Sequence, residues 1–481
     1  MSYKALIRDS FFYIPSKILP AATTILFISF LYRNIEPTAF VNYSVAIAIS
    51  LISTQLSSGW VANSILFHFP NAKNHSDFLI RAIFITVLTS ILGILIGVSV
   101  ILWNGATAQV VIAAVFLMIG QSGFYVLSSI FQSRRNILGQ LKAVTLQCSF
   151  QVIALFVLFK YDYGSDACAI FAYGTGFFIA CFYYLVIIFP EFRLNERKNF
   201  SSLCSFNSTD IKNIIGYGLP LGLWTFSILL ANSSDRFFLK HIEDVANAAS
   251  YVSAKDLLVG AAGLVTMPLL MASHPIILKL ARDAKWSDAE NIIKNNIQIL
   301  VLLFSVYLTS IQFVGLFLLK LMFGMKYSID IDILLVMLFG LLFSCVSMYA
   351  QKNLEALGKT ILMAGLAAIV AVLCIAMSAL IIPRFGAMGA AWCFVASNFL
   401  YLVLVVRSAR VSIKTLLRAG NFIPPVLVWI LGYGIDTFIR HSELFKDWDS
   451  VFKNFAWISL FTVLIGAVMY FYYRAFYLRA K

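Results

Sequence analysis

Long, uninterrupted apolar stretches recur along the whole chain and limit what it can fold into. Each is close to the ~20 residues that an α-helix needs to cross a bilayer. Continuous apolarity over such lengths indicates helices, because barrel strands would appear as ~10-residue segments of alternating hydrophobicity. The sequence therefore predicts an all-α polytopic membrane protein with about fourteen transmembrane helices. The stretches lie at 11–33, 40–67, 80–103, 109–131, 142–160, 168–189, 213–240, 247–272, 297–320, 330–350, 360–382, 387–406, 420–439 and 455–474.

Composition and charge agree with this class. Hydrophobic residues make up 61% of the 481 residues and charged residues only 12%, which excludes an ordinary soluble domain. With the N-terminus inside, the cytoplasmic connections hold more than twice as many Lys and Arg as the external ones. Both termini are therefore predicted to be cytoplasmic. The net charge of +14 is dispersed over short loops, so it indicates topology and not a nucleic-acid partner.

Several kinds of chemistry are missing from the sequence. The seven cysteines include no C-x-x-C motif, and the five histidines show no metal-ligand spacing, so neither a disulfide framework nor a metal site is predicted. No G-x-x-x-x-G-K-[ST] loop is present, so no ATP hydrolysis is expected. The external connections are short, and the longest, 440–454, has no nucleophile motif. We expect a protein without catalytic residues or cofactors, and therefore not an enzyme.

Weak internal similarity divides the first twelve segments into six and six. "YGSDACAIFAYG" (163–174) aligns with "FGAMGAAWCFVAS" (385–397), and Pro20 corresponds to Pro220. An even number of helices gives both halves the same orientation, as in transporters whose parallel repeats enclose a central cavity. The predicted parts are a six-helix bundle at 1–190, a cytoplasmic linker at 191–212, a second six-helix bundle at 213–410 and two additional helices at 411–481.

Five charged residues lie inside the apolar stretches. A charge at the centre of a membrane helix costs ~2.5–3.5 kcal/mol on insertion scales, so one that persists usually faces a cavity or a partner. Three of the five are cations, which predicts a cationic, anion-binding cavity wall formed by Arg236, Lys255 and Lys17. Asp235 is expected either to orient Arg236 or to carry a coupling proton. The five residues are Lys17, Asp235, Arg236, Lys255 and Asp256.

Each of these residues also has a simpler interpretation. Asp235 and Arg236 could form an ion pair at the external interface, with Arg236 snorkelling outward. Lys255 could reach the outer headgroups and Lys17 the inner ones. Pro20 and Pro220 are predicted to break their helices and act as hinges around the cavity, and the alternative is a packing kink.

Motifs along the chain resemble a family of membrane transporters. They resemble, in order and spacing, those of Wzx-type oligosaccharide flippases of the multidrug/oligosaccharidyl-lipid/polysaccharide (MOP) exporter superfamily. The resemblance covers most of the chain and is best over 213–407. The motifs are "YGLPLGLWTFSILLANSSDRFFLKH", "ASYVSAKDLL", "LFLLKLMFGMKYS", "EALGKT" and "IIPRFGAMGAAWCFVASN".

The resemblance implies a substrate and a location. The substrate would be a polyprenyl-pyrophosphate-linked oligosaccharide repeat unit, moved to the outer face of a bacterial inner membrane for O-antigen, capsule or exopolysaccharide synthesis. Membrane lipid, a polysaccharide polymerase and chain-length machinery would be partners. The last two helices resemble the extra pair of lipid II flippases, where they help to make a lipid-facing groove.

The main alternative is a multidrug or cation antiporter of the same superfamily. Such an exporter would be expected to hold an intramembrane carboxylate in its N-terminal half. The acidic residues of this half lie at or beyond the ends of the apolar stretches, whereas the deeper charges are mainly Lys and Arg, which suit a pyrophosphate. A membrane glycosyltransferase or polymerase is disfavoured by the missing large external loop. The acidic residues are Asp9, Glu36, Asp77, Asp162, Asp166 and Glu191.

Overall fold

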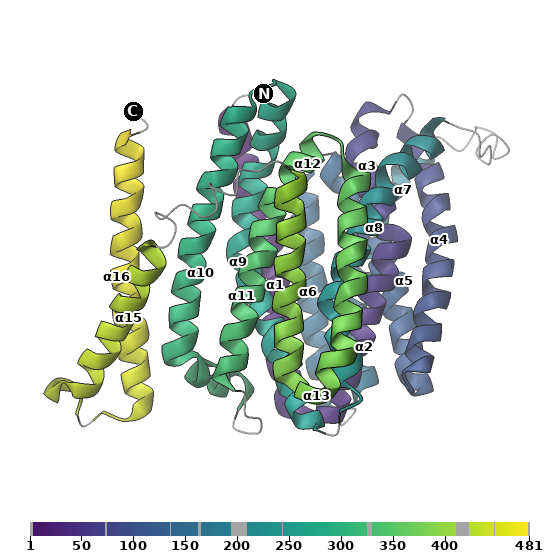
Figure 1. The fold of residues 1–481 in the computed structure, drawn as a ribbon. Coiled ribbons are helices and arrows are strands. Elements are labelled where there is room, and N and C mark those ends of the chain that lie inside the picture. Colours follow the sequence, from purple (N-terminus) through teal and green to yellow (C-terminus); the bar gives the residue numbers. More distant parts are fainter. Residues whose placement is uncertain are drawn as a thin grey trace.

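The computed structural model describes residues 3–72, 75–134, 136–161, 165–193, 209–242, 244–324, 330–409, 423–446 and 448–479. Within these ranges the chain is helical and has no β-strand, which confirms the predicted fold class (Figure 1). The longer helices are α1 (Tyr3–Asn34), α2 (Pro37–Thr54), α3 (Trp60–His68), α4 (His75–Trp103), α5 (Ala108–Ser133), α6 (Ile137–Lys160), α7 (Asp166–Arg193), α8 (Thr209–Leu239), α9 (Val245–Arg282), α10 (Trp286–Phe323), α11 (Ile331–Ala350), α13 (Thr360–Ser408), α15 (Ile423–His441) and α16 (Ser450–Arg479). A short helix, α12 (Lys352–Ala356), joins α11 to α13.

The helices have the length and surface of membrane spans. Ten helices within the described ranges are long and apolar enough to cross a bilayer, and α1 contributes a shorter apolar part, Ile18–Asn34. α4 has an apolar outer face, on which Leu88, Ile91, Leu92 and Leu95 are all exposed. A continuous face of such side chains is favourable in contact with lipid and unfavourable in contact with water.

α2 and α3 form one span, joined by a π-helical segment, Gln55–Gly59. α13, in contrast, contains two spans. Its backbone leaves helical geometry at Gly386, and the two halves form a hairpin (Figure 1). Each of the fourteen predicted stretches therefore corresponds to a helical segment.

The packing pattern repeats between the two parts of the chain. α1 packs against α6 and α5 against α7, while α8 packs against α13 and α13 against α11. Between the two parts, α1 contacts α9 and α3 contacts α8. The division into two six-helix bundles stays a prediction, and residues 194–208 of the proposed linker lie outside the described ranges.

The seam between α3 and α8 is close because of two glycines. A Cβ added at Gly218 would lie 2.4 Å from the Trp60 carbonyl oxygen, and one added at Gly222 would lie 2.3 Å from the Trp60 Cβ. Both distances are shorter than real contacts allow. The G-x-x-x-G spacing places the two glycines on one helix face, the usual means of bringing membrane helices together.

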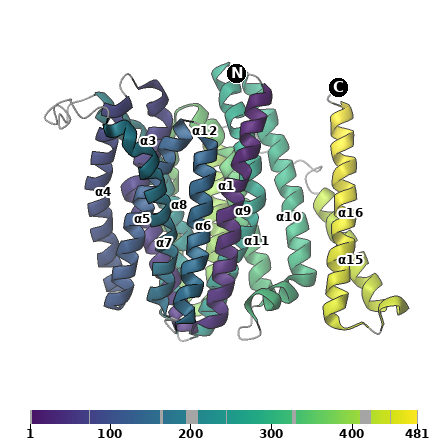
Figure 2. The same cartoon turned by 180° about the vertical axis from the view of Figure 1, so that it is seen from behind.

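The two additional C-terminal helices stand at the edge of the molecule. α15 and α16 pack against each other and against α10, and both views place them beside α10, away from α4 (Figures 1 and 2). Trp429 of α15 donates a hydrogen bond to Gln312 of α10 at 2.9 Å. Both ends of the chain lie at the same end of the bundle, as an even number of spans requires.

The structure places both prolines inside continuous helices. α1 continues through Pro20 and α8 continues through Pro220. A proline inside a helix removes one backbone hydrogen bond, but neighbouring helices can hold the segment in place. The irregular backbone lies instead at Gln55–Gly59 and Gly386. A hinge role for the prolines stays a prediction.

Gly386 is expected to be indispensable to the α13 hairpin. Its φ of 56° and ψ of −137° lie in a backbone region that residues with a Cβ rarely adopt. Among the described residues no atom lies within 4 Å of an added Cβ, so a methyl group would meet no steric clash. Gly386→Ala should therefore destabilise the protein by ~1–3 kcal/mol through backbone strain alone.

Thermal unfolding of the purified protein in detergent measures this effect. Gly365→Ala is the matched control, because Gly365 lies in the helical part of α13 with equally open surroundings. The control should be neutral or slightly stabilising, as expected for Ala in a helix. Equal melting temperatures for the two variants would show that the backbone at position 386 accepts a Cβ without strain.

Candidate functional site

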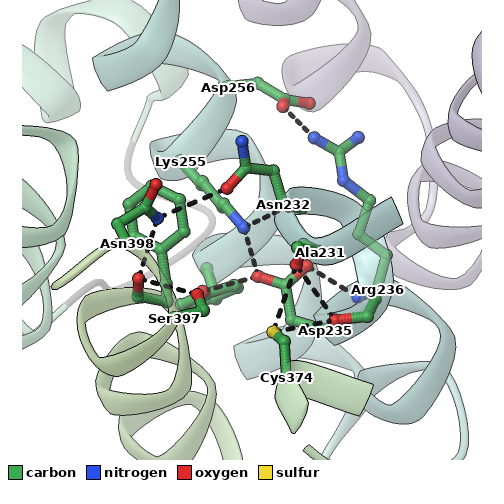
Figure 3. Close-up of polar contacts among 12 residues, drawn as sticks. Ala231, Asn232, Asp235, Arg236, Lys255, Asp256, Cys374, Ser397 and Asn398 are labelled. Carbon is green, nitrogen blue, oxygen red and sulfur yellow. Dashed lines mark hydrogen bonds and ion pairs between the residues drawn. The ribbon is translucent and has the colours of Figure 1, made fainter. Parts of the chain in front are cut away.

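The structure places the predicted site residues on three helices. Asp235 and Arg236 lie in the last turns of α8, and Lys255 lies about 15 Å (1.5 Å per residue) beyond the Val245 start of α9. Lys17 belongs to α1, but its side chain lies outside the described part of the structure. α8 and α9 bring Asp235, Arg236, Lys255 and Asp256 into one cluster (Figure 3).

Lys255 and Asp235 form a buried ion pair. Each residue is 3% exposed, and the Lys255 ammonium contacts the Asp235 carboxylate directly. The ammonium also donates to the Asn232 carbonyl oxygen at 2.6 Å and lies 4.3 Å from the centre of the Phe394 ring. The Tyr251 hydroxyl donates to the same carboxylate at 2.8 Å. This burial excludes the interpretation of Lys255 as a side chain that reaches the headgroups.

Arg236 forms the second pair of the cluster, with Asp256. The guanidinium contacts the Asp256 carboxylate directly, and the two side chains are 12% and 21% exposed. A second nitrogen, Nη1, donates to the Ser44 hydroxyl of α2 at 2.6 Å. Nε is buried and has no hydrogen-bond partner among the described residues. Arg236 therefore holds a carboxylate of α9 and a hydroxyl of α2, and within the described part of the chain one of its donors is unused.

Asp235 and Arg236 do not form the ion pair of the simpler interpretation. From Arg236 the Asp235 carboxylate accepts the backbone N–H, at 2.9 Å, and its ionic partner is Lys255. The cluster consequently holds two cations and two carboxylates, so in this conformation it is balanced and not cationic. A buried charge without a partner would cost several kcal/mol, which explains why each cation has its own carboxylate.

Neutral polar groups surround the two pairs. Asn398 donates to the Asn232 side-chain oxygen at 3.3 Å, and the Cys374 thiol lies 3.3 Å from the Ala231 carbonyl oxygen. Asn398 and Cys374 belong to different halves of α13. Sequence reasoning missed both, because Asn398 is one polar residue in an apolar helix and Cys374 resembles a small hydrophobe. Tyr251 could have been found from its position one turn before Lys255 on the same helix face.

Contacts between the two predicted bundles occur at both ends of the molecule. Near the end opposite the chain termini, Arg236 reaches Ser44, the Tyr32 hydroxyl donates to Ser250 at 2.9 Å and Lys240 donates to the Asn104 carbonyl oxygen at 2.6 Å. Toward the other end, the Ser64 hydroxyl donates to the Ile214 carbonyl oxygen at 2.7 Å, and the Phe67 and Tyr217 rings stack. Through the contact of Arg236 with Ser44, the ion cluster borders the seam between the two predicted bundles.

The described residues offer no metal site. Among them, no group of three or more His, Cys, Asp or Glu side chains could hold a metal ion.

The buried pair should be far more sensitive to loss of one partner than to loss of both. Asp235→Asn or Lys255→Met leaves an unpaired buried charge and should destabilise the protein by ~3–5 kcal/mol, whereas the double variant should recover most of that loss. Unfolding in detergent provides the measurement. The exposed pair of Asp436 and Arg440 is the control, and Asp436→Asn should cost only ~0.3–0.5 kcal/mol. Additive effects of the two buried substitutions would contradict the pairing.

Comparison with known proteins identifies the fold. No protein-family profile matches the chain. The capsular polysaccharide biosynthesis protein CapF of Staphylococcus aureus is 23% identical over 260 residues, which are 52% of this chain and 62% of that protein, so this chain covers less than two thirds of its relative. A structure of the lipid II flippase MurJ, in an inward closed conformation, matches with a TM-score of 0.71 and 15% identity, over 98% of this chain and 99% of its own.

A multidrug resistance transporter of the MATE family matches less completely. Its inward-facing structure gives a TM-score of 0.62 and 14% identity, over 84% of this chain and 96% of its own. The fold that the resemblance in the sequence implied is thus confirmed. The chain has the fold shared by the flippase MurJ and the MATE transporters of the MOP superfamily.

Proposed function

We propose that this protein is a flippase that moves a polyprenyl-pyrophosphate-linked oligosaccharide across the bacterial inner membrane by alternating access. The observation that carries the proposal is the extent of the match with MurJ. The lipid II flippase covers 98% of this chain, whereas the MATE transporter covers 84%, a difference comparable in length to segment 411–481 with α15 and α16. The matched capsular polysaccharide protein supports a glycan pathway, such as capsule or O-antigen synthesis.

The distribution of charge favours a flippase over a multidrug or cation antiporter. In the first half, the carboxylates whose side chains the structure describes, Glu36, Asp77 and Asp166, lie at the N-terminal ends of helices. The described buried charges of the helix interiors belong to the second half. A pyrophosphate that reached Arg236 could replace Asp256 as its partner, and the unused Nε would give the planar fork that phosphate oxygens prefer.

In the proposed mechanism the two bundles separate first at one end and then at the other. Opening near the chain termini requires the Ser64 and Phe67 contacts to break, and opening at the far end requires the Tyr32 and Arg236 contacts to break. The positive-inside bias orients the chain termini toward the cytoplasm, so the head group would enter from that side. The polymerase and chain-length machinery would act on the product.

Arg236 is the residue on which this proposal depends most. Arg236→Ala should reduce export about ten- to hundredfold, since a hydrogen bond to a charged group contributes about 1.5–3 kcal/mol. Arg236→Lys should recover only part of the activity because an ammonium lacks the fork. Export is measured as surface polysaccharide in a strain deleted for its own flippase, with membrane levels of each variant checked in parallel. Full export by a well-expressed Arg236→Ala protein would refute the role of this residue.

Alternating access itself can be tested at the seam. In a background whose seven cysteines are replaced by serine, Tyr32→Cys with Ser250→Cys places one thiol on each side. A short bifunctional thiol reagent should abolish export by holding the far end closed, and a reductant should restore it.

The control pair is Trp224→Cys with Tyr401→Cys, which joins α8 to α13 inside the second bundle. Cross-linking this pair should leave most of the export intact, because these helices are expected to move together. Export that survives complete cross-linking of the seam pair would exclude separation at that end.

A further inference from the structure

Two apolar grooves on the outside of the bundle differ in the charged side chain that each contains. The first, of about 350 Å³, lies between α1, α6 and α10 and includes Leu26, Phe30, Phe156, Met322 and Arg33. We call it the Arg33 groove. The second, of about 440 Å³, is lined by α11 and α13 and includes Phe339, Phe343, Trp392 and Asp332. We call it the Asp332 groove. The two grooves are similar in volume and both are mainly apolar, but their charged side chains have opposite signs. The Asp332 groove can therefore serve as a control for the Arg33 groove.

The walls of the Arg33 groove suit a hydrocarbon chain. Leu26 is 63% exposed and Phe156 is 54% exposed, so both are accessible to lipid. Phe30 supports Phe156 edge to face at a centroid distance of 4.8 Å and contacts Phe159 at 5.2 Å, which keeps the wall rigid. Ser29 and Arg33 are the polar side chains in the lining. So few hydrogen-bonding groups cannot recognise a sugar, whereas an aliphatic chain needs none.

Arg33 supplies a positive charge at the end of this groove. Its Nε donates to the Met322 carbonyl oxygen at 2.7 Å and its Nη2 donates to the Leu321 carbonyl oxygen, so the guanidinium is held against the end of α10. Among the described residues no carboxylate forms an ion pair with Arg33. The carbonyl oxygens at the C-terminal end of α10 offset only part of its positive charge.

A second cation lies near the same end. Lys160 is exposed and lies one turn beyond Phe156 on the same face of α6. Because α1 and α6 both end there, we expect the two cations to lie at the depth where a bilayer presents its phosphates.

We propose that the Arg33 groove binds an anionic phospholipid, with one acyl chain along Phe30 and Phe156 and the phosphate beside Arg33 and Lys160. Charge complementarity selects this occupant, since a guanidinium is suited to phosphate oxygens and each cation near the surface favours an anionic lipid roughly fivefold. The site is distinct from the ion cluster and does not depend on the transported substrate. Because Arg33 also ties α1 to α10, the lipid would bind where the two predicted bundles meet.

Site-specific photo-crosslinking tests the proposal in the full-length protein. A benzoylphenylalanine is placed at Phe156 or, as the matched control, at Phe339 of the Asp332 groove, which is 47% exposed. The protein is reconstituted in nanodiscs of equal phosphatidylglycerol and phosphatidylcholine. Mass spectrometry then gives the ratio of the two cross-linked lipids. We expect at least fivefold phosphatidylglycerol enrichment at position 156 and a ratio of about one or less at position 339.

Charge variants complete the test. Arg33→Gln keeps donors for the α10 carbonyl oxygens but removes one of the two positive charges, so it should lower the ratio at position 156 about fivefold, while Arg33→Lys should preserve most of the enrichment. Equal ratios at positions 156 and 339 in the unsubstituted protein, or a ratio at position 156 that Arg33→Gln leaves unchanged, would overturn the proposal. Displacement of phosphatidylglycerol by a small amount of undecaprenyl phosphate would also overturn it, because the groove would then select the isoprenoid carrier. None of these readouts requires export, so they are independent of the proposed flippase activity.

Discussion

A charge buried among apolar helices must find its partner within the protein, and this requirement fixes how α8 and α9 pack against each other. Lys255 and Asp235 satisfy each other between α9 and α8, and Tyr251, Phe394 and a backbone carbonyl complete their surroundings. Arg236 and Asp256 repeat the arrangement beside them. The positions of α8 and α9 are thereby coupled through two ion pairs, and α13 is attached through Asn398 and Cys374.

The balanced charges bear on how the proposed anionic substrate would bind and leave. A free cationic cavity would bind a pyrophosphate strongly and release it slowly. In this cluster each cation already has a carboxylate partner, so an arriving anion must compete with Asp256 for Arg236. The affinity for the anion is then reduced by the free energy of the Arg236–Asp256 pair that it breaks. Arg236 is also bonded to Ser44 across the seam, so the same exchange of partners would loosen a contact between the bundles. Substrate binding and bundle movement would then share one side chain.

Much of the architecture could be predicted from the sequence because the bilayer imposes a simple rule. Apolar stretches near the required length become helices, and all fourteen predicted stretches do so. The buried charges were also visible in the sequence, since Asp235, Arg236, Lys255 and Asp256 stand out in apolar surroundings. Their pairing was not. Adjacent residues in a helix point about 100° apart, so Asp235 and Arg236 were unsuited to pair with each other.

The sequence by itself determined the class of protein, the number of helical segments and the identity of the interior charges, because each depends on local hydrophobicity. The tertiary structure alone decided which carboxylate neutralises which cation, and it placed Ser44 and Asn398 at the cluster. It also showed that the helices continue through Pro20 and Pro220, while the chain bends at Gly386. These outcomes depend on helices distant in the sequence meeting at one depth and rotation, which local hydrophobicity does not encode.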